Sequence, residues 1–139
     1  MKYLVDSNVL SEPTKDRPEP KVMKWLAAHR DQICTSILVF GEIERGIDKL
    51  NHTKRAQRLE AWYRDLSGAL SAEQRVLGVD MAVISRWAAV YNREERLMKR
   101  RPQIIESLLA ATADLHGLTL VSRNKKDFSS AISILNPWE

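Results

Sequence analysis

The fold is decided by the stretch Lys2-Tyr3-Leu4-Val5-Asp6-Ser7-Asn8-Val9-Leu10, in which a short apolar run stops abruptly at an aspartate. Tyrosine, leucine and valine favour a buried strand, and two small polar residues follow the acid. In an α/β sheet the ligand-binding groups lie at the carboxyl ends of the strands. We therefore expect Asp6 to project a carboxylate into a crevice at that edge of the sheet.

The remaining chain alternates strand patterns with helical ones. The pattern predicts strands over 2–5, 32–36, 76–79, 118–121 and 131–135, a polar connection over 13–20, and helices over 21–29, 38–50, 53–70, 80–101 and 103–116. Asp80 is the expected N-cap of its helix, Gly117 closes the last helix, and Gly68 is expected to break the third. This alternation predicts an α/β fold with a central parallel sheet covered by helices on both faces, in one domain spanning 1–139.

Composition narrows the class of protein. Of 139 residues, 44% are hydrophobic and 29% charged, which is typical of a globular domain, and no apolar run is long enough to cross a membrane. The amino-terminal segment does not resemble a signal peptide, and the single cysteine, Cys34, fits a reducing cytoplasm. The net charge of +4 is compatible with a protein that binds a phosphate backbone around an acidic centre.

Three further acids stand in apolar surroundings or beyond a strand. Glu42 lies within the helical stripe formed by Val39, Ile43 and Ile47, where the alternative is a structural ion pair with an arginine. Glu106 falls in the first turn after Pro102, where the helix dipole alone could explain an acid. Asp127 follows the strand over 118–121, and its alternative role is to cap its own turn.

Gathering these carboxylates would require a cation. Two carboxylates about 6 Å apart repel by roughly 3 kcal/mol at an effective dielectric near 20. Oxygen ligands without histidine or thiolate point to Mg²⁺ or Mn²⁺. We expect Asp6 and Glu106 to bind the ion, with Asp127 and Glu42 completing the site directly or through water, and the chemistry to be metal-assisted hydrolysis of a phosphodiester.

Four segments in chain order resemble the PIN-domain ribonucleases, in particular the VapC/FitB-type toxins of type II toxin–antitoxin systems. They are Val5–Asn8, Phe40–Gly46, Glu106–Thr112 and Val121–Phe128, and the ending Leu135–Glu139 is similar as well. The resemblance implies a three-layer PIN fold and a Mg²⁺- or Mn²⁺-dependent endoribonuclease acting on RNA. It also implies a homodimer, neutralised by a small antitoxin whose tail occupies the acidic cleft.

The resemblance also assigns residues. Asp6, Glu42, Glu106 and Asp127 correspond to the family's acidic quartet, with Asp6, Glu106 and Asp127 as metal ligands. Its flanking polar positions, which would hold the acids or metal-bound waters, are matched by Ser7, Asn8, Ser122 and Asn124. Relatives usually carry Asp where this chain has Glu106, and the extra methylene extends the reach of the carboxylate.

The basic residues have two interpretations. Arg123, Lys125 and Lys126 flank Asp127 and are candidates for binding RNA phosphates, although a solvated turn explains them equally well. The basic run over 93–101 is interpreted as a solvated helix face.

Two other functions compete with the nuclease. One is a PIN-fold module that binds RNA or protein with little catalysis. The other is a phosphatase using Asp6 as a nucleophile, which would require an acid two positions later, where Asn8 stands.

Overall fold

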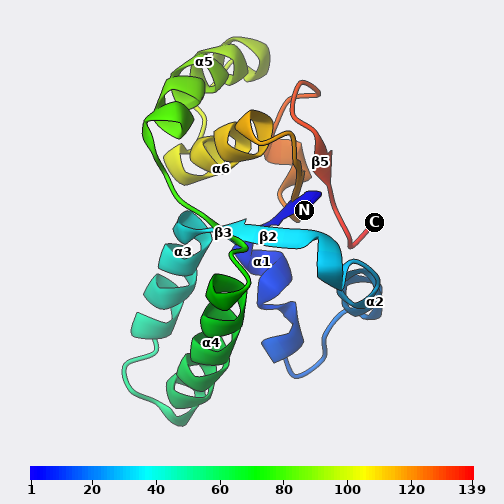
Figure 1. Ribbon diagram of the computed structural model, residues 1–139, viewed down its shortest axis with the longest axis vertical. Helices are drawn as coiled ribbons and strands as arrows, with labels where there is room; N and C mark the ends of the chain where they lie inside the picture. The colour runs from blue at the N-terminus through cyan, green and yellow to red at the C-terminus, as the bar shows by residue number, and fades with distance from the viewer.

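Five parallel strands form the central sheet, in the spatial order β3-β2-β1-β4-β5 (Figure 1). In the computed structural model, which describes residues 1–139, they are β1 (Tyr3–Val5), β2 (Ile33–Ser36), β3 (Val76–Leu77), β4 (Thr119–Val121) and β5 (Ile134–Leu135). The parallel sheet confirms the predicted α/β class. The strand that ends at Asp6 lies in the middle of the sheet, between β2 and β4.

Helices cover both faces of this sheet. They are α1 (Ser7–Leu10), α2 (Pro20–Ala28), α3 (Ile37–Asp48), α4 (Lys54–Ala72), α5 (Met81–Met98) and α6 (Ile104–Leu115). Figure 1 shows α5 and α6 on one side of the sheet and α1 to α4 on the other. Right-handed crossovers explain this division, because the chain steps from β1 to β3 in one direction and then returns to β4.

The main core lies between the sheet and its helices. β1 and β4 are its most deeply buried strands, with Leu4, Val5, Leu120 and Val121 fully inaccessible to solvent. Cys34 is buried in β2 as a small core residue, without a disulfide. A smaller apolar cluster joins α5, α6 and the segment before β5. None of the six helices combines the length and apolar composition that a membrane span requires.

Helix ends mostly follow the expected capping residues. The Asp80 carboxylate accepts a hydrogen bond from the Val83 N–H at 2.9 Å, and Gly117 closes α6 with a φ of 66°. The predicted break of the third helix at Gly68 was wrong, since α4 runs unbroken to Ala72. The predicted helix over 80–101 ends earlier, because Lys99 adopts a left-handed φ of 55° and releases the next residues into a loop.

Two other boundaries differ from the sequence prediction. The short helix α1 begins directly after Asp6, and four residues are too few to reveal a helical period. The last strand contains only Ile134 and Leu135, because the chain before it turns, with the Ile132 N–H donating to the Ser129 carbonyl.

Candidate functional site

Asp6 is held at the carboxyl end of β1 by hydrogen bonds from two sides. The residue is only 6% exposed. Its Oδ1 accepts from the Ser7 N–H at 2.7 Å, and its Oδ2 accepts from the Ser122 hydroxyl at 2.8 Å. Burial raises the pKa of the Asp6 carboxyl and outweighs these hydrogen bonds, which act to lower it. The protein therefore fixes a carboxylate where water solvates it poorly.

A chain of polar contacts connects Asp6 to Glu106. The buried Ser122 hydroxyl, while donating to Asp6, accepts the Asn124 N–H at 3.1 Å. The Asn124 side-chain amide then donates to Glu106 Oε1 at 3.2 Å. Ser122 and Asn124 thus orient two of the four acids.

Glu106 lies in the first turn of α6, as the sequence predicted, and is half-buried. Burial raises the pKa of its carboxyl, and the negative charges of Asp127 and Asp6 raise it further. The hydrogen bond from Asn124 and the positive charge of Arg100 oppose this rise. Glu106 therefore lies within electrostatic reach of both Asp6 and Asp127.

Glu42 approaches the same acids from α3. The expectation that it lies within the buried stripe was wrong: Val39, Ile43 and Ile47 are buried, whereas Glu42 is exposed at the edge of the stripe. Its carboxyl is nonetheless partly shielded, and this burial together with the charges of Asp6 and Glu106 raises its pKa to about 7, against the opposing charge of Arg45. Gly46, one turn later, has no protein atom near its missing side chain.

Asp127 lies in a short 3₁₀ turn over Lys125–Asp127, and not directly at a strand end. Its Oδ1 lies 3.6 Å from Nη2 of Arg100, which comes from the loop between α5 and α6. Asp127 is the only one of the four acids that has an ion pair. The sequence analysis assigned the basic run containing Arg100 to a solvated surface and did not identify this contact.

The four acids are neighbours, but they are not packed as tightly as ligands of one ion. No three histidine, cysteine, aspartate or glutamate side chains lie close enough together to hold the same metal. The donors are all carboxylates, the oxygen ligands that Mg²⁺ and Mn²⁺ accept, and Mg²⁺ usually keeps several waters with one or two protein carboxylates. The donor chemistry therefore fits such an ion bound by few protein ligands and completed by water.

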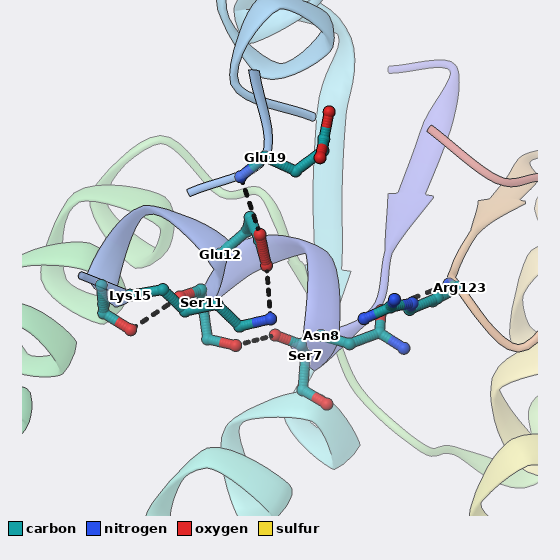
Figure 2. Close-up of polar contacts among 8 residues, drawn as sticks. Ser7, Asn8, Ser11, Glu12, Lys15, Glu19 and Arg123 are labelled. Atoms are coloured by element: carbon teal, nitrogen blue, oxygen red, sulfur yellow. Dashed lines mark hydrogen bonds and ion pairs between the residues drawn. The ribbon is translucent and has the colours of Figure 1, made fainter. Parts of the chain in front are cut away.

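The supporting polar residues divide into two groups. Ser7 and Ser122 contact Asp6, and Asn124 contacts Glu106, as expected for residues that hold the acids. Asn8 does not contact an acid. Its side-chain oxygen accepts the Arg123 N–H at 3.5 Å, so it connects α1 to the turn after β4 (Figure 2).

Two of the three predicted RNA-binding cations already have partners in the carboxyl-terminal tail. The Arg123 guanidinium lies 5.0 Å from the centre of the Trp138 ring, and Lys125 Nζ lies 3.6 Å from a Glu139 carboxylate oxygen. Lys126 is exposed and forms no ion pair. Their role in RNA binding stays a prediction.

Two buried glutamates near the site escaped the sequence analysis. Glu12, only 2% exposed, pairs with Lys15 at 2.7 Å and accepts the Glu19 N–H at 3.1 Å, which fixes the connection from α1 to α2 (Figure 2). Glu94 was assigned to a solvated face, but it is buried and accepts hydrogen bonds from the N–H and hydroxyl of Ser129. The contact between Glu94 and Ser129 spans 35 positions, and the Glu19 N–H lies seven positions beyond Glu12, so neither contact follows from helical periodicity.

Two hollows adjoin the acids. A pocket of about 200 Å³ is lined by Glu106, Asp127, Glu94, Arg100 and Arg101. A groove of about 470 Å³ between α1, α3 and α4 has Ser7, Asn8 and Glu42 at one end, and its apolar wall is formed by Ile43, Ile47, Leu50, Leu59 and Trp62. The fold and site define the class of molecule: an α/β protein with an acidic crevice at the carboxyl edge of a parallel sheet.

Comparison with known proteins identifies the family. The family model described as PIN domain matches residues 3–132, so the chain belongs to the PIN-domain family. Toxin FitB of Neisseria gonorrhoeae is 29% identical over 140 residues, covering 97% of both chains. VapC ribonuclease Y4jK of Sinorhizobium fredii is 28% identical over 142 residues, covering 98% of this chain and 97% of the relative. The structure of FitAB bound to a DNA fragment superimposes with a TM-score of 0.88 at 25% identity, covering 99% of this chain and 96% of that one.

Proposed function

We propose that this chain is a divalent-metal-dependent endoribonuclease and the toxin of a toxin–antitoxin pair. The main support for the proposal is that neighbouring acids without ion-pair partners raise one another's pKa. Asp6, Glu42 and Glu106 have no ion-pair partner, and the pKa values of Glu42 and Glu106 are raised in part by neighbouring acids. A protein retains such a cluster at a cost in stability, and a bound cation would relieve that cost.

Asp6 and Glu106 would hold the ion, and Asp127 would reach it through bound water, since no three of the acids lie close enough together to share it directly. A bound Mg²⁺ or Mn²⁺ supplies a water of lowered pKa and neutralises charge on the phosphate. Ser7 and Ser122 keep Asp6 oriented, and Asn124 does the same for Glu106. Glu42 lies within electrostatic reach of Asp6 and Glu106, and its carboxylate, which the charge of a bound ion would keep ionised, would be available to accept a proton from water.

The names of two relatives support the choice of substrate and role. One relative is named a VapC ribonuclease and another a toxin, FitB. A structural neighbour that covers the whole chain is a toxin–antitoxin complex from Klebsiella pneumoniae. We therefore propose RNA as the substrate, a small antitoxin as a protein partner, and a homodimer as the assembly. The exposed apolar side chains of Met81 and Ile84 on α5 are available for association.

Cleavage of RNA by the purified, antitoxin-free protein tests the activity. Structured RNAs are incubated with Mg²⁺, with Mn²⁺ or with a chelator, beside the Asp6→Asn variant. We expect cleavage with either metal, none in chelator and none by Asp6→Asn. Cleavage that persists in chelator would exclude the metal mechanism. Expression of the chain should arrest growth, and both Asp6→Asn and co-expression of a small neighbouring gene should relieve the arrest.

One observation favours a second candidate, a PIN-fold module that binds RNA with weak catalysis. No three acids are close enough together to share an ion. Glu106→Asp separates the two candidates: a nuclease should retain metal-dependent cleavage, whereas a binding module should retain affinity for RNA without cleavage in either form.

A further inference from the structure

The loop that joins α5 to α6 brings two arginines to the acidic crevice. Helix α5 ends where Lys99 turns left-handed, and α6 begins after Pro102 at Ile104. Arg100 and Arg101 therefore protrude between the two helices, and both line the 200 Å³ pocket that contains Glu106 and Asp127. The loop thus adds positive charge at the edge of a site whose other charged groups are mainly acids.

Arg100 is the cation nearest to these acids. Its guanidinium lies 3.6 Å from Asp127, and about half of the side chain remains exposed to solvent. An exposed ion pair of this kind contributes between about zero and 1 kcal/mol to stability, so releasing Arg100 from Asp127 costs little. The contact therefore neutralises Asp127 while leaving the guanidinium able to change partner.

The chemistry of the pocket favours a phosphate group. A guanidinium presents planar, paired N–H donors that match two phosphate oxygens. The pocket, at about 200 Å³, is smaller than the roughly 300–1,000 Å³ that encloses a whole small-molecule ligand, so it suits one phosphate of a chain passing over it. The three cations expected from the sequence, Arg123, Lys125 and Lys126, do not line this pocket.

We propose that Arg100, assisted by Arg101, binds a backbone phosphate of RNA beside the acidic crevice, and that it exchanges Asp127 for this phosphate when RNA arrives. This inference rests on the proposed ribonuclease function, because it assigns the substrate contact of that same site. Asp127 is freed by the exchange, so RNA binding and exposure of the acid are coupled.

RNA binding without catalysis tests the proposal. The affinity of the wild-type protein for fluorescein-labelled oligouridylate is measured by anisotropy in chelator over a series of salt concentrations. Phosphate contacts do not depend on base sequence, so this probe reports them even though the natural RNA is unidentified. Arg100→Gln should bind about tenfold more weakly. Its plot of log affinity against log salt should be shallower by about 0.7, the value for one lost phosphate contact on a single strand.

Matched variants separate this role from a structural one. Arg86→Gln removes an exposed arginine of α5 that does not line the pocket and whose guanidinium lies 2.7 Å from the Asp114 carboxylate. This variant should leave the affinity and the salt slope unchanged. Arg100→Lys should keep the salt slope but lose part of the affinity, because lysine lacks the paired donors.

The outcomes distinguish this proposal from the function on which it rests. If wild-type protein cleaves RNA while Arg100→Gln matches wild type in affinity and salt slope, the Arg100 assignment is overturned and the nuclease stands. If the wild-type protein neither cleaves RNA nor binds the probe, the proposed function fails and the assignment fails with it. A reduced salt slope in Arg100→Gln but not in Arg86→Gln supports the assignment.

Discussion

Ser122 Oγ donates to Asp6 Oδ2 at 2.8 Å and at the same time accepts the N–H of Asn124, so a single buried hydroxyl orients an acid and the turn that holds a second acid. The two residues of this contact come from adjacent strands in the middle of the sheet. The site is therefore anchored beside the two most deeply buried strands of the sheet.

Ser122→Ala should destabilise the protein at neutral pH. The change leaves the buried Asp6 carboxylate without one donor, which costs about 1–3 kcal/mol, and it should raise the pKa of Asp6 further. Urea unfolding measures the loss of stability. The exposed Ser130→Ala serves as the control and should unfold like wild type. Equal stability of the two variants would contradict a supporting role for Ser122.

Glu42 should titrate near neutral pH in the metal-free protein. Carbon-detected NMR of the carboxyl should give a pKa of about 7, and Asp6→Asn should lower it towards the ordinary value of 4.5 because a neighbouring negative charge disappears. Asp114→Asn removes a carboxylate outside the crevice and should leave the pKa of Glu42 unchanged. An unaltered pKa in Asp6→Asn would show that the two acids do not interact.

The same shift has a consequence for stability. The folded protein disfavours the ionised form of Glu42, so the stability of the metal-free protein should fall as pH rises from 4.5 to about 7. In Glu42→Gln, stability should fall less as the pH rises, because glutamine does not ionise. Solvent around the exposed side chain keeps the effect small.

Asp6→Asn should have opposite effects with and without metal. In chelator it removes a poorly solvated charge, so the variant should unfold at a higher temperature than wild type. Saturating Mg²⁺ should stabilise wild type, by about 2.7 kcal/mol at one hundred times the dissociation constant, and should not stabilise Asp6→Asn. Thermal unfolding with and without Mg²⁺ measures both effects. Equal stabilisation of both proteins would place the metal elsewhere.

Glu12→Gln should lower the free energy of unfolding mainly at neutral pH. Burial alone would raise the pKa of Glu12, but the hydrogen bonds from Lys15 and the Glu19 N–H, with the charges of Lys15 and Arg123, together lower it below 4.5. This ionised state stabilises the fold above pH 4.5, and the contribution is lost as pH falls through the lowered value.

Urea unfolding at neutral and acidic pH measures the contribution of Glu12. The free energy of unfolding of Glu12→Gln should be about 1–3 kcal/mol lower than that of wild type at neutral pH, and should approach the wild-type value at acidic pH. Glu60→Gln, on the exposed face of α4, should follow wild type at both pH values. A constant difference at all pH values would exclude the ionised state of Glu12 as the cause.

The sequence predicted those elements of the fold that leave a local hydrophobic pattern in the chain. The run before Asp6 indicated a strand, and the apolar segment around Glu106 indicated a buried helix, because burial in a layered fold imposes a period on the chain. The rule that ligand-binding groups lie at the carboxyl ends of parallel strands placed Asp6 at the end of β1, whereas Glu106 lies in the first turn of α6 and Asp127 in a turn beyond β4. These inferences required no knowledge of individual contacts.

The contacts that escaped prediction join residues without a periodic relation. Glu94 is buried because Ser129, 35 positions later, satisfies it, and Arg100 reaches Asp127 only because Lys99 ends α5 early. Glu42 lies beside the apolar stripe and not within it, a difference of one helical position that the printed sequence does not resolve. Long-range side-chain contacts account for Glu94 and Arg100, whereas the position of Glu42 depends on how α3 packs against the core.

The contact between Asp6 and Ser122 spans 116 positions, and β1 is also paired with β4 along its whole length. During synthesis, Asp6 leaves the ribosome 116 positions ahead of Ser122. The acid is therefore made early but oriented late, after the strand that supports it has left the exit tunnel. Nascent fragments that end before β4 carry the acid without its supporting strand, so assembly of the crevice waits for the synthesis of β4.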